Sequence, residues 1–286
     1  MTSDLMRASL LGLAVGDALG SQFFVPSNRS FFVSRTLPPA PWQWTDDTEM
    51  AASVAHVLDL HGHIDQDALA ASFAAHHDFD RGYGPGTGRL LRLVRAGGDW
   101  RVLAREAFGG QGSWGNGAAM RVAPLGARHA GDPDAAARDA ALSAEVTHPH
   151  PEAVAGAVAV AVAAALRARG PSAPGPFLDE ILRHVPPGRV RTGIVAARRL
   201  LPLSDASAVA EVLGNGRLVA AHDTVPFTLW VAARHGADYR TAFWAAAGAG
   251  GDVDTTCAIV GGILGTPPPD WAASTEPLPS WLPAPY

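Results

Sequence analysis

Stretches rich in alanine and leucine recur along this chain of 286 residues, and glycine or proline separates each from the next. Alanine and leucine have high helix propensity, whereas glycine and proline interrupt helices. Alternating runs of Val, Ile and Thr, which indicate strands, are almost absent. The pattern therefore predicts an all-α fold. The expected helices span residues 4–19, 48–60, 66–77, 87–96, 117–130, 134–146, 151–169, 190–201, 224–235, 239–249 and 255–264.

Residues that typically begin helices agree with these positions. Asp65, Asp134 and Asp238 each stand where an N-cap residue would, and Pro151 suits a first helical turn. The high content of alanine and glycine lets helix axes approach closely, which favours a compact multi-helix globule over a bundle with thick leucine layers.

The chain shows no division into parts. No linker rich in Ser, Gly or Pro splits it into halves, and no repeat of fixed period is present. We therefore expect a single domain over residues 1–286. The proline-rich residues 267–286 are expected to pack as an extended strap over its surface.

Composition excludes several classes of protein. An apolar content of 48% with 17% charged residues excludes global disorder. The formal net charge of −5, with scattered arginines, argues against stable nucleic-acid binding. The longest apolar run, residues 153–166, falls short of the roughly 20 residues that cross a bilayer, so it predicts a buried helix. A single cysteine, Cys257, and an N-terminal apolar stretch interrupted by Gly16 and Asp17 lead us to expect a cytoplasmic protein without a membrane partner.

A first acidic cluster stands where a loop turns into a helix. It contains Thr45, Asp46 and Asp47, whose oxygen ligands suit Mg²⁺, Mn²⁺ or Ca²⁺. Taken alone, the cluster also fits a helix capping box, because Glu49 follows Asp46 by three residues.

A second cluster, Asp252, Asp254 and Thr255, repeats this pattern at a glycine-rich helix entry. Residues two apart in an extended segment point to opposite sides, but glycines can bend the backbone so that both converge or flank two cations. Four carboxylates gathered without counter-ions would repel, whereas a pair of divalent cations would keep them ionised. Together, the two clusters predict a metal site.

A glycine-rich loop at residues 109–117 is the third candidate. Its N–H groups at a helix start can hold a diphosphate, and Trp114 offers a flat surface for a ring. The loop lacks a P-loop ending, so a flexible turn remains an alternative. His148, held beside Pro149, fits substrate binding or capping. Zinc is not expected without a HExxH or Cys/His pattern, and no nucleophile elbow supports a Ser-His-Asp hydrolase.

Taken together, these segments resemble the ADP-ribosylglycohydrolase family, the group of dinitrogenase-reductase-activating glycohydrolases and ADP-ribosylhydrolases. The matching stretches keep their order and separation over nearly the whole chain. They are residues 12–20 (GLAVGDALG), 45–48 (TDDT), 112–121 (GSWGNGAAMR), 147–148 (TH) and 251–255 (GDVDT).

The resemblance implies a compact all-helical domain with two Mg²⁺ or Mn²⁺ ions at the bottom of a cleft. One ion would be served by the first cluster and the other by the second, with Asp254 bridging. The implied metal ligands are Thr45, Asp46, Asp47, Asp252, Asp254 and Thr255. The implied ligand-binding residues are Ser113, Trp114, Gly115 and Asn116, for the diphosphate and adenine, and His148, lining the ADP-ribose cleft.

The family's reaction releases ADP-ribose from a modified acceptor by hydrolysing the bond at the anomeric carbon of the distal ribose. We expect the acceptor to be a protein side chain, with a nucleic acid as the alternative. A metal pair can grip the ribose hydroxyls and position a water, which carboxylates then orient and deprotonate. We expect Asp46, Asp47 and Asp254 to be catalytic.

The chain departs from the family at Phe24, where many members carry a glutamate that binds metal or acts in catalysis; Asp47 and Glu49 are candidates to replace it. The alternatives to an active hydrolase are a non-catalytic ADP-ribose-binding or structural relative, and a metal-dependent phosphohydrolase acting on a different ester.

Overall fold

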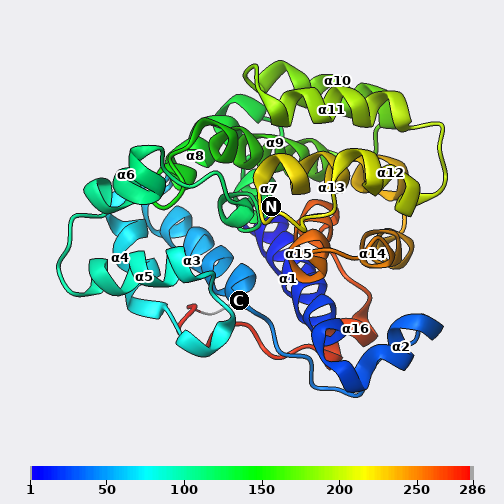
Figure 1. The fold of residues 1–286 in the computed structure, drawn as a ribbon, viewed down its shortest axis with the longest axis horizontal. Coiled ribbons are helices and arrows are strands. Elements are labelled where there is room, and N and C mark those ends of the chain that lie inside the picture. The colour runs from blue at the N-terminus through cyan, green and yellow to red at the C-terminus, as the bar shows by residue number, and fades with distance from the viewer. Residues whose placement is uncertain (1, 284–286) are drawn as a thin grey trace.

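The computed structural model describes residues 2–283, and within these residues the chain forms helices and two isolated bridges but no strand (Figure 1). The predicted all-α fold is confirmed. The helices are α1 Thr2–Ser21, η1 Gln22–Phe24, η2 Pro26–Asn28, α2 Arg29–Ser34, α3 Asp46–His61, α4 Gln66–His76, η3 Phe79–Arg81, α5 Pro85–Arg95, α6 Trp100–Gly110, η4 Asn116–Ala118, α7 Ala123–Arg128, α8 Pro133–Glu145, α9 Pro151–Ala168, α10 Pro174–His184, α11 Arg189–Leu200, α12 Ala206–Leu213, α13 Ala221–His235, α14 Tyr239–Gly248, α15 Val253–Leu264 and α16 Pro269–Ser274.

Most of the predicted helix starts are correct. Asp65 and Asp238 are N-caps whose side chains accept backbone N–H bonds, and Pro151 stands in the first turn of α9. The prediction for Asp134 is wrong. Asp132 caps α8 instead, accepting from the N–H of Ala135 at 2.9 Å, because the proline that follows it fits the first helical position.

Several helices were not predicted: α6, α10 and α12, and the short α2 and α16. Prolines or charged residues interrupt the apolar residues of α6 and α10, and α2, α12 and α16 have eight residues or fewer. The predicted helix 117–130 is broken into η4 and α7. The tail is only partly extended, since residues 269–274 form α16 and Trp271 is buried. Residues 284–286 of the predicted strap lie outside the described residues.

The centre of the fold is the contact between α1 and α15, which run side by side in Figure 1. Gly12, Gly16 and Gly20 recur every four residues on α1 and therefore form one face of the helix. A β-carbon on Gly20 would stand 2.8 Å from the Cα of Asp254, so only glycine allows this approach. The expected close approach of helix axes thus places the end of α1 directly against the second acidic cluster.

The apolar helix α9 lies inside the molecule. By length and composition it could cross a membrane, and so could the bent pair formed by residues 2–24 and 26–34 if it is counted as one span. However, 67% of the apolar window of α9 is buried, and α7, α8 and α13 pack around it. The prediction of a buried helix is therefore confirmed.

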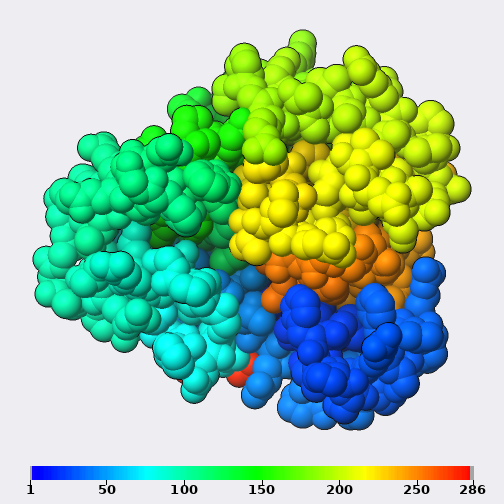
Figure 2. Space-filling view, in the orientation of Figure 1, coloured from blue at the N-terminus to red at the C-terminus, as the bar shows by residue number. Residues whose placement is uncertain are grey.

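The end of α1 meets the starts of α3 and α15, because Asp17 accepts a hydrogen bond from the N–H of Thr48 in α3 and Gly20 packs against Asp254 of α15. The space-filling view shows the surface hollowed where the cyan, yellow, orange and blue segments come together (Figure 2). The loops that precede α3 and α15 carry the two acidic clusters into this region.

Candidate active site

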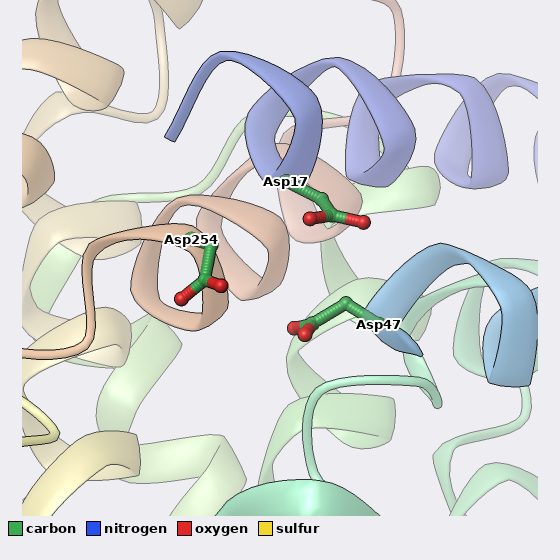
Figure 3. A group of neighbouring side chains, drawn as sticks. All are labelled: Asp17, Asp47 and Asp254. Carbon is green, nitrogen blue, oxygen red and sulfur yellow. The ribbon is translucent and has the colours of Figure 1, made fainter. Parts of the chain in front are cut away.

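Asp17, Asp47 and Asp254 converge from α1, α3 and α15 (Figure 3). One carboxylate oxygen of each lies within 4.8 Å of the others. Asp17 and Asp47 are 0% and 1% exposed. The structure therefore brings together one aspartate from each predicted cluster and adds Asp17, to which the sequence analysis gave no role. Its signal in the sequence was a single charged residue within the otherwise uncharged stretch 8–21 of α1.

Both carboxylate oxygens of Asp17 accept hydrogen bonds from residues at the start of α3. Its Oδ2 accepts hydrogen bonds from the N–H of Thr45 at 2.9 Å and from the N–H and hydroxyl of Thr48 at 3.1 and 2.6 Å. Its Oδ1 accepts from the hydroxyl of Thr45 at 2.7 Å. Burial raises the pKa of Asp17, and these bonds oppose the rise. Asp17 thus fastens α1 to the first acidic cluster.

Asp47, unlike Asp17, accepts few hydrogen bonds from the described residues. Its Oδ1 is buried without a hydrogen-bond partner among the described residues, and its Oδ2 is 3.3 Å from the Thr45 hydroxyl. Burial raises the pKa of Asp47 well above its ordinary value, and the charges of Asp17 and Asp254 raise it further. A buried carboxylate oxygen without a partner is costly, which is expected where a ligand completes the site.

The neighbouring carboxylates share this environment. Burial, followed by the charge of Asp252, raises the pKa of Asp254, and burial, followed by the charge of Asp17, raises that of Asp46 to about 8. Within residues 2–283, no ion pair includes Asp17, Asp47 or Asp254. Because a group of carboxylates without a cationic side chain suits a hard divalent cation, these residues fit a metal.

The side chains of Asp252 and Asn116 form a hydrogen bond with each other. The sequence analysis assigned Asp252 to a metal and Asn116 to the diphosphate. The Asn116 side chain donates to Asp252 Oδ2 at 2.7 Å and to Thr224 Oγ1 at 3.1 Å. The Asn116 amide group therefore orients Asp252 and does not face an open cleft, since the residue is 3% exposed. Thr255 is buried, and its N–H donates to Asp254 Oδ1 at 2.8 Å.

His148 lies beneath the glycine-rich loop, and its place along the ADP-ribose cleft stays a prediction. It is 4% exposed, and its Nδ1 is 2.6 Å from the hydroxyl of Thr147. A β-carbon on Gly117 would stand 3.0 Å from its Nε2, so the bare backbone of the loop rests on the imidazole. Burial, and then the charge of Arg121, lowers the pKa of His148 to about 3, so the ring is neutral at pH 7.

Trp114 is the exposed part of the glycine-rich loop, with 37% of its surface accessible. Its ring centroid is 5.3 Å from that of Phe108 and 5.7 Å from that of His150. The loop is fixed by an isolated antiparallel bridge between Gly115 and Ala220, and Ser113 Oγ accepts from the N–H of Gly115 at 3.2 Å. The aromatic group is therefore presented on an ordered backbone.

The order of these segments agrees with a known family. The family model described as ADP-ribosylglycohydrolase matches residues 2–267. The chain belongs to the ADP-ribosylglycohydrolase family. This membership, with the ADP-ribosylhydrolases described next, indicates a glycosidic-bond hydrolase.

The chain matches different shares of the length of its known relatives. The chain is 33% identical to ADP-ribosylhydrolase ARH3 of Xenopus tropicalis over 63% of this chain, and it spans only 55% of that relative. It is 28% identical to ADP-ribosylhydrolase ARH3 of Homo sapiens over 94% of this chain and 88% of that protein. A solved structure described as an ADP-ribosylglycohydrolase-related protein complex has a TM-score of 0.60 and 28% identity, covering 96% of this chain and 93% of the other.

Two residues bear on the departure from the family pattern. Phe24 lies in η1 and is 54% exposed, so it is not part of the core. Glu49, a candidate to replace the family's glutamate, is held elsewhere: its Oε2 accepts from the hydroxyl of Tyr83 at 2.6 Å and from the N–H of Asp78 at 3.0 Å. Of the two candidates, Asp47 is the one with a fully buried oxygen that has no hydrogen-bond partner among the described residues.

Proposed function

We propose that this protein is a metal-dependent ADP-ribosyl hydrolase that cleaves the bond at the anomeric carbon of the distal ribose. The observation that carries the proposal is the group of Asp17, Asp47 and Asp254, in which the buried Oδ1 of Asp47 has no partner within residues 2–283. Family membership supplies the substrate class, since ADP-ribosylated acceptors are the substrates that the family name describes.

Two divalent cations, Mg²⁺ or Mn²⁺, would be held by Asp46, Asp47 and Thr45 on one side and Asp252, Asp254 and Thr255 on the other. Bound there, the cations would supply Lewis acidity and grip the ribose hydroxyls. Asn116 holds the Asp252 carboxylate in place through its 2.7 Å hydrogen bond. The hydroxyl of Thr45, which donates to Asp17 at 2.7 Å, keeps lone pairs free for a cation.

The carboxylates also act on the substrate. Cleavage at an anomeric carbon develops positive charge on the ribose, and a field dominated by carboxylates stabilises that charge. The unpartnered Oδ1 of Asp47 is suited to accept a proton from the attacking water. Asp46 and Asp254 share the buried environment that raises the pKa of Asp47, which brings their basicity closer to neutral pH.

The glycine-rich loop would hold the rest of the ligand. The backbone N–H groups of Ser113 and Trp114 would face the diphosphate, because those of Gly115 and Asn116 donate to Ser113 Oγ and to the carbonyl of Val219. The exposed ring of Trp114 would stack on the adenine. Neutral His148 supports this loop from below. We also propose a cytoplasmic location, because the single cysteine forms no disulfide within the chain.

Hydrolysis is tested by incubating the protein with ADP-ribosylated arginine, serine and nucleic-acid substrates, in Mg²⁺, in Mn²⁺ and in chelator. Free ADP-ribose should appear with metal only, and Asp47→Asn should abolish its release. The variant Glu211→Gln serves as control, because Glu211 is an exposed carboxylate on α12 and is not part of the group of Asp17, Asp47 and Asp254.

Other outcomes separate the alternatives. If ADP-ribose binds in calorimetry but is never released from any acceptor, the protein is a non-catalytic binding relative. If AMP is produced instead of ADP-ribose, the protein is a phosphohydrolase acting on the diphosphate. Either result overturns the proposed reaction.

A further inference from the structure

The C-terminal segment beyond residue 267, where the family match ends, packs against the loop that leads into α3. The N–H of Trp42 donates to the carbonyl of Ser274, and the N–H of Glu276 donates to the carbonyl of Trp42, both at 2.8 Å. The indole N–H of Trp44 donates to the carbonyl of Pro277 at 3.0 Å. Both tryptophans are buried, so the C-terminal segment packs firmly on the loop that leads into the first acidic cluster.

Arg81 of η3 joins this tail to the same loop. Its guanidinium donates to both carboxylate oxygens of Glu276, at 2.8 and 2.9 Å. It also donates to the carbonyl of Trp44 at 3.0 Å, and its Cζ lies 3.5 Å above the Trp44 ring. The side chains of Arg81 and Glu276 are only 19% and 27% exposed, so solvent weakens the pair less than it would at an open surface.

The Trp44 carbonyl belongs to the same peptide group as the N–H of Thr45, and that N–H donates to Asp17 Oδ2 at 2.9 Å. A trans peptide is planar and directs its carbonyl and its N–H to opposite sides. This one peptide is therefore held by Arg81 on one side and by Asp17 on the other. Its rotation sets the direction in which the chain enters Asp46 and Asp47.

We propose that Arg81 and Glu276 are positioning residues for the acidic site. Glu276 fixes the Arg81 guanidinium, and Arg81 fixes the Trp44–Thr45 peptide and hence the first acidic cluster. The proposal rests on the proposed function in taking that cluster as a metal site. Asp78 does not replace Glu276, because its carboxylate is 3.6 Å from Arg81 Nε and half exposed.

The test compares two single substitutions in the C-terminal segment. Glu276→Gln removes the carboxylate that orients Arg81 at nearly unchanged volume. Asp270→Asn is the matched control, because Asp270 also pairs with an arginine, Arg240, whose guanidinium lies over the ring of Trp271. Calorimetry with Mn²⁺ should show about 10-fold weaker binding in Glu276→Gln and unchanged binding in Asp270→Asn, an effect typical of residues that orient metal ligands from behind.

A second arm separates positioning from general docking of the tail. Arg81→Met should weaken Mn²⁺ binding as Glu276→Gln does, and the double variant should be no worse than Arg81→Met, since Glu276 acts through Arg81. With a substrate, kcat should fall while KM changes little, because the glycine-rich loop is untouched. Equal metal affinity in wild type and Glu276→Gln, or equal losses in Glu276→Gln and Asp270→Asn, would overturn the proposal.

Hydrogen exchange keeps the two proposals distinguishable. Backbone amides of residues 42–49 should exchange faster in Glu276→Gln than in Asp270→Asn, with or without metal. Wild-type protein that binds no Mn²⁺ defeats the proposed function, whereas the exchange comparison still decides whether Glu276 holds this peptide. Unchanged exchange in Glu276→Gln defeats the positioning role alone.

Discussion

The carboxylate of Asp17 accepts hydrogen bonds from both the backbone N–H and the hydroxyl of Thr48, at 3.1 and 2.6 Å. These bonds join α1 to the first turn of α3, and Thr45 adds two more. Asp47, in the same group, has an oxygen that nothing within residues 2–283 contacts by hydrogen bond. Two buried carboxylates therefore have different tasks: Asp17 holds the site together, and Asp47 is left for a ligand.

This difference predicts opposite effects of the same substitution. Asp17→Asn should lower the free energy of unfolding of the metal-free protein by about 2 kcal/mol, because the new NH2 group replaces one acceptor oxygen and faces a buried donor of Thr45 or Thr48. Asp47→Asn should leave that free energy unchanged or raise it, because it removes a buried like charge. Urea unfolding in chelator measures both variants. Equal destabilisation by the two substitutions would contradict the division of tasks.

The free energy of unfolding of the metal-free protein should fall as pH rises from 6.5 to about 8 and then level off. Burial raises the folded-state pKa of Asp46 to about 8, far above the unfolded value, so its contribution is present at low pH and is lost as pH rises through about 8. The buried histidines have lowered pKa values and act below pH 6.5, outside this window.

Metal reverses this trend, since cations bind deprotonated carboxylates and displace protons. The increase in unfolding temperature caused by Mn²⁺ should therefore grow from pH 6.5 to about 8. Scans in chelator and in Mn²⁺ give the two curves, and Asp46→Asn should flatten the metal-free one. A metal-free curve that rises over this range would show that the acidic group is not protonated when folded.

The glycine-rich loop should be sensitive at Gly117. A β-carbon there would stand 2.9 Å from His148 Cε1, so Gly117→Ala forces the loop or the ring to shift, at about 1–3 kcal/mol. ADP-ribose affinity measured by calorimetry should fall with it. Gly86→Ala is the control, because a β-carbon on Gly86 meets nothing within 4 Å.

The same position offers a rescue. His148→Ala removes the ring that the new methyl group would meet, so Gly117→Ala should cost less in the His148→Ala background than alone. Additive losses in the double variant would mean that the loop is disturbed for another reason than contact with the imidazole.

The sequence predicted what depends on local preference and missed what depends on distant partners. Helix positions follow from alanine and leucine propensity, so α9, α11 and α15 were predicted closely. The helix α10, which begins with two prolines in its first three residues, was not predicted. The two acidic clusters were predicted to converge because each forms a recognisable motif within a few consecutive residues. The bond from Arg81 to Glu276 joins residues 195 apart, and no local pattern marks such a pair. The role of His148 was likewise hidden, because it depends on a loop folding over the ring.

Phe24 marks the place where the family's glutamate is missing, and it offers a gain-of-function test. Its side chain is 54% exposed in η1, just after α1, so Phe24→Glu removes little buried apolar surface. Gly20, four residues earlier, packs against Asp254, which keeps the start of this segment beside the acidic group. A carboxylate at position 24 should therefore add a metal ligand and strengthen Mn²⁺ binding, at roughly 10-fold in affinity or as a second bound ion.

The neighbouring substitution Val25→Glu is the control, since Val25 is also exposed, at 42%, and adds the same charge one residue away. Calorimetric titration with Mn²⁺ reports affinity and stoichiometry for both variants. A gain confined to Phe24→Glu would show that this chain keeps the pocket and lacks only the ligand. The same modest gain in both would reflect general attraction of the cation by added negative charge, and no gain in Phe24→Glu would show that η1 directs position 24 away from the acidic site.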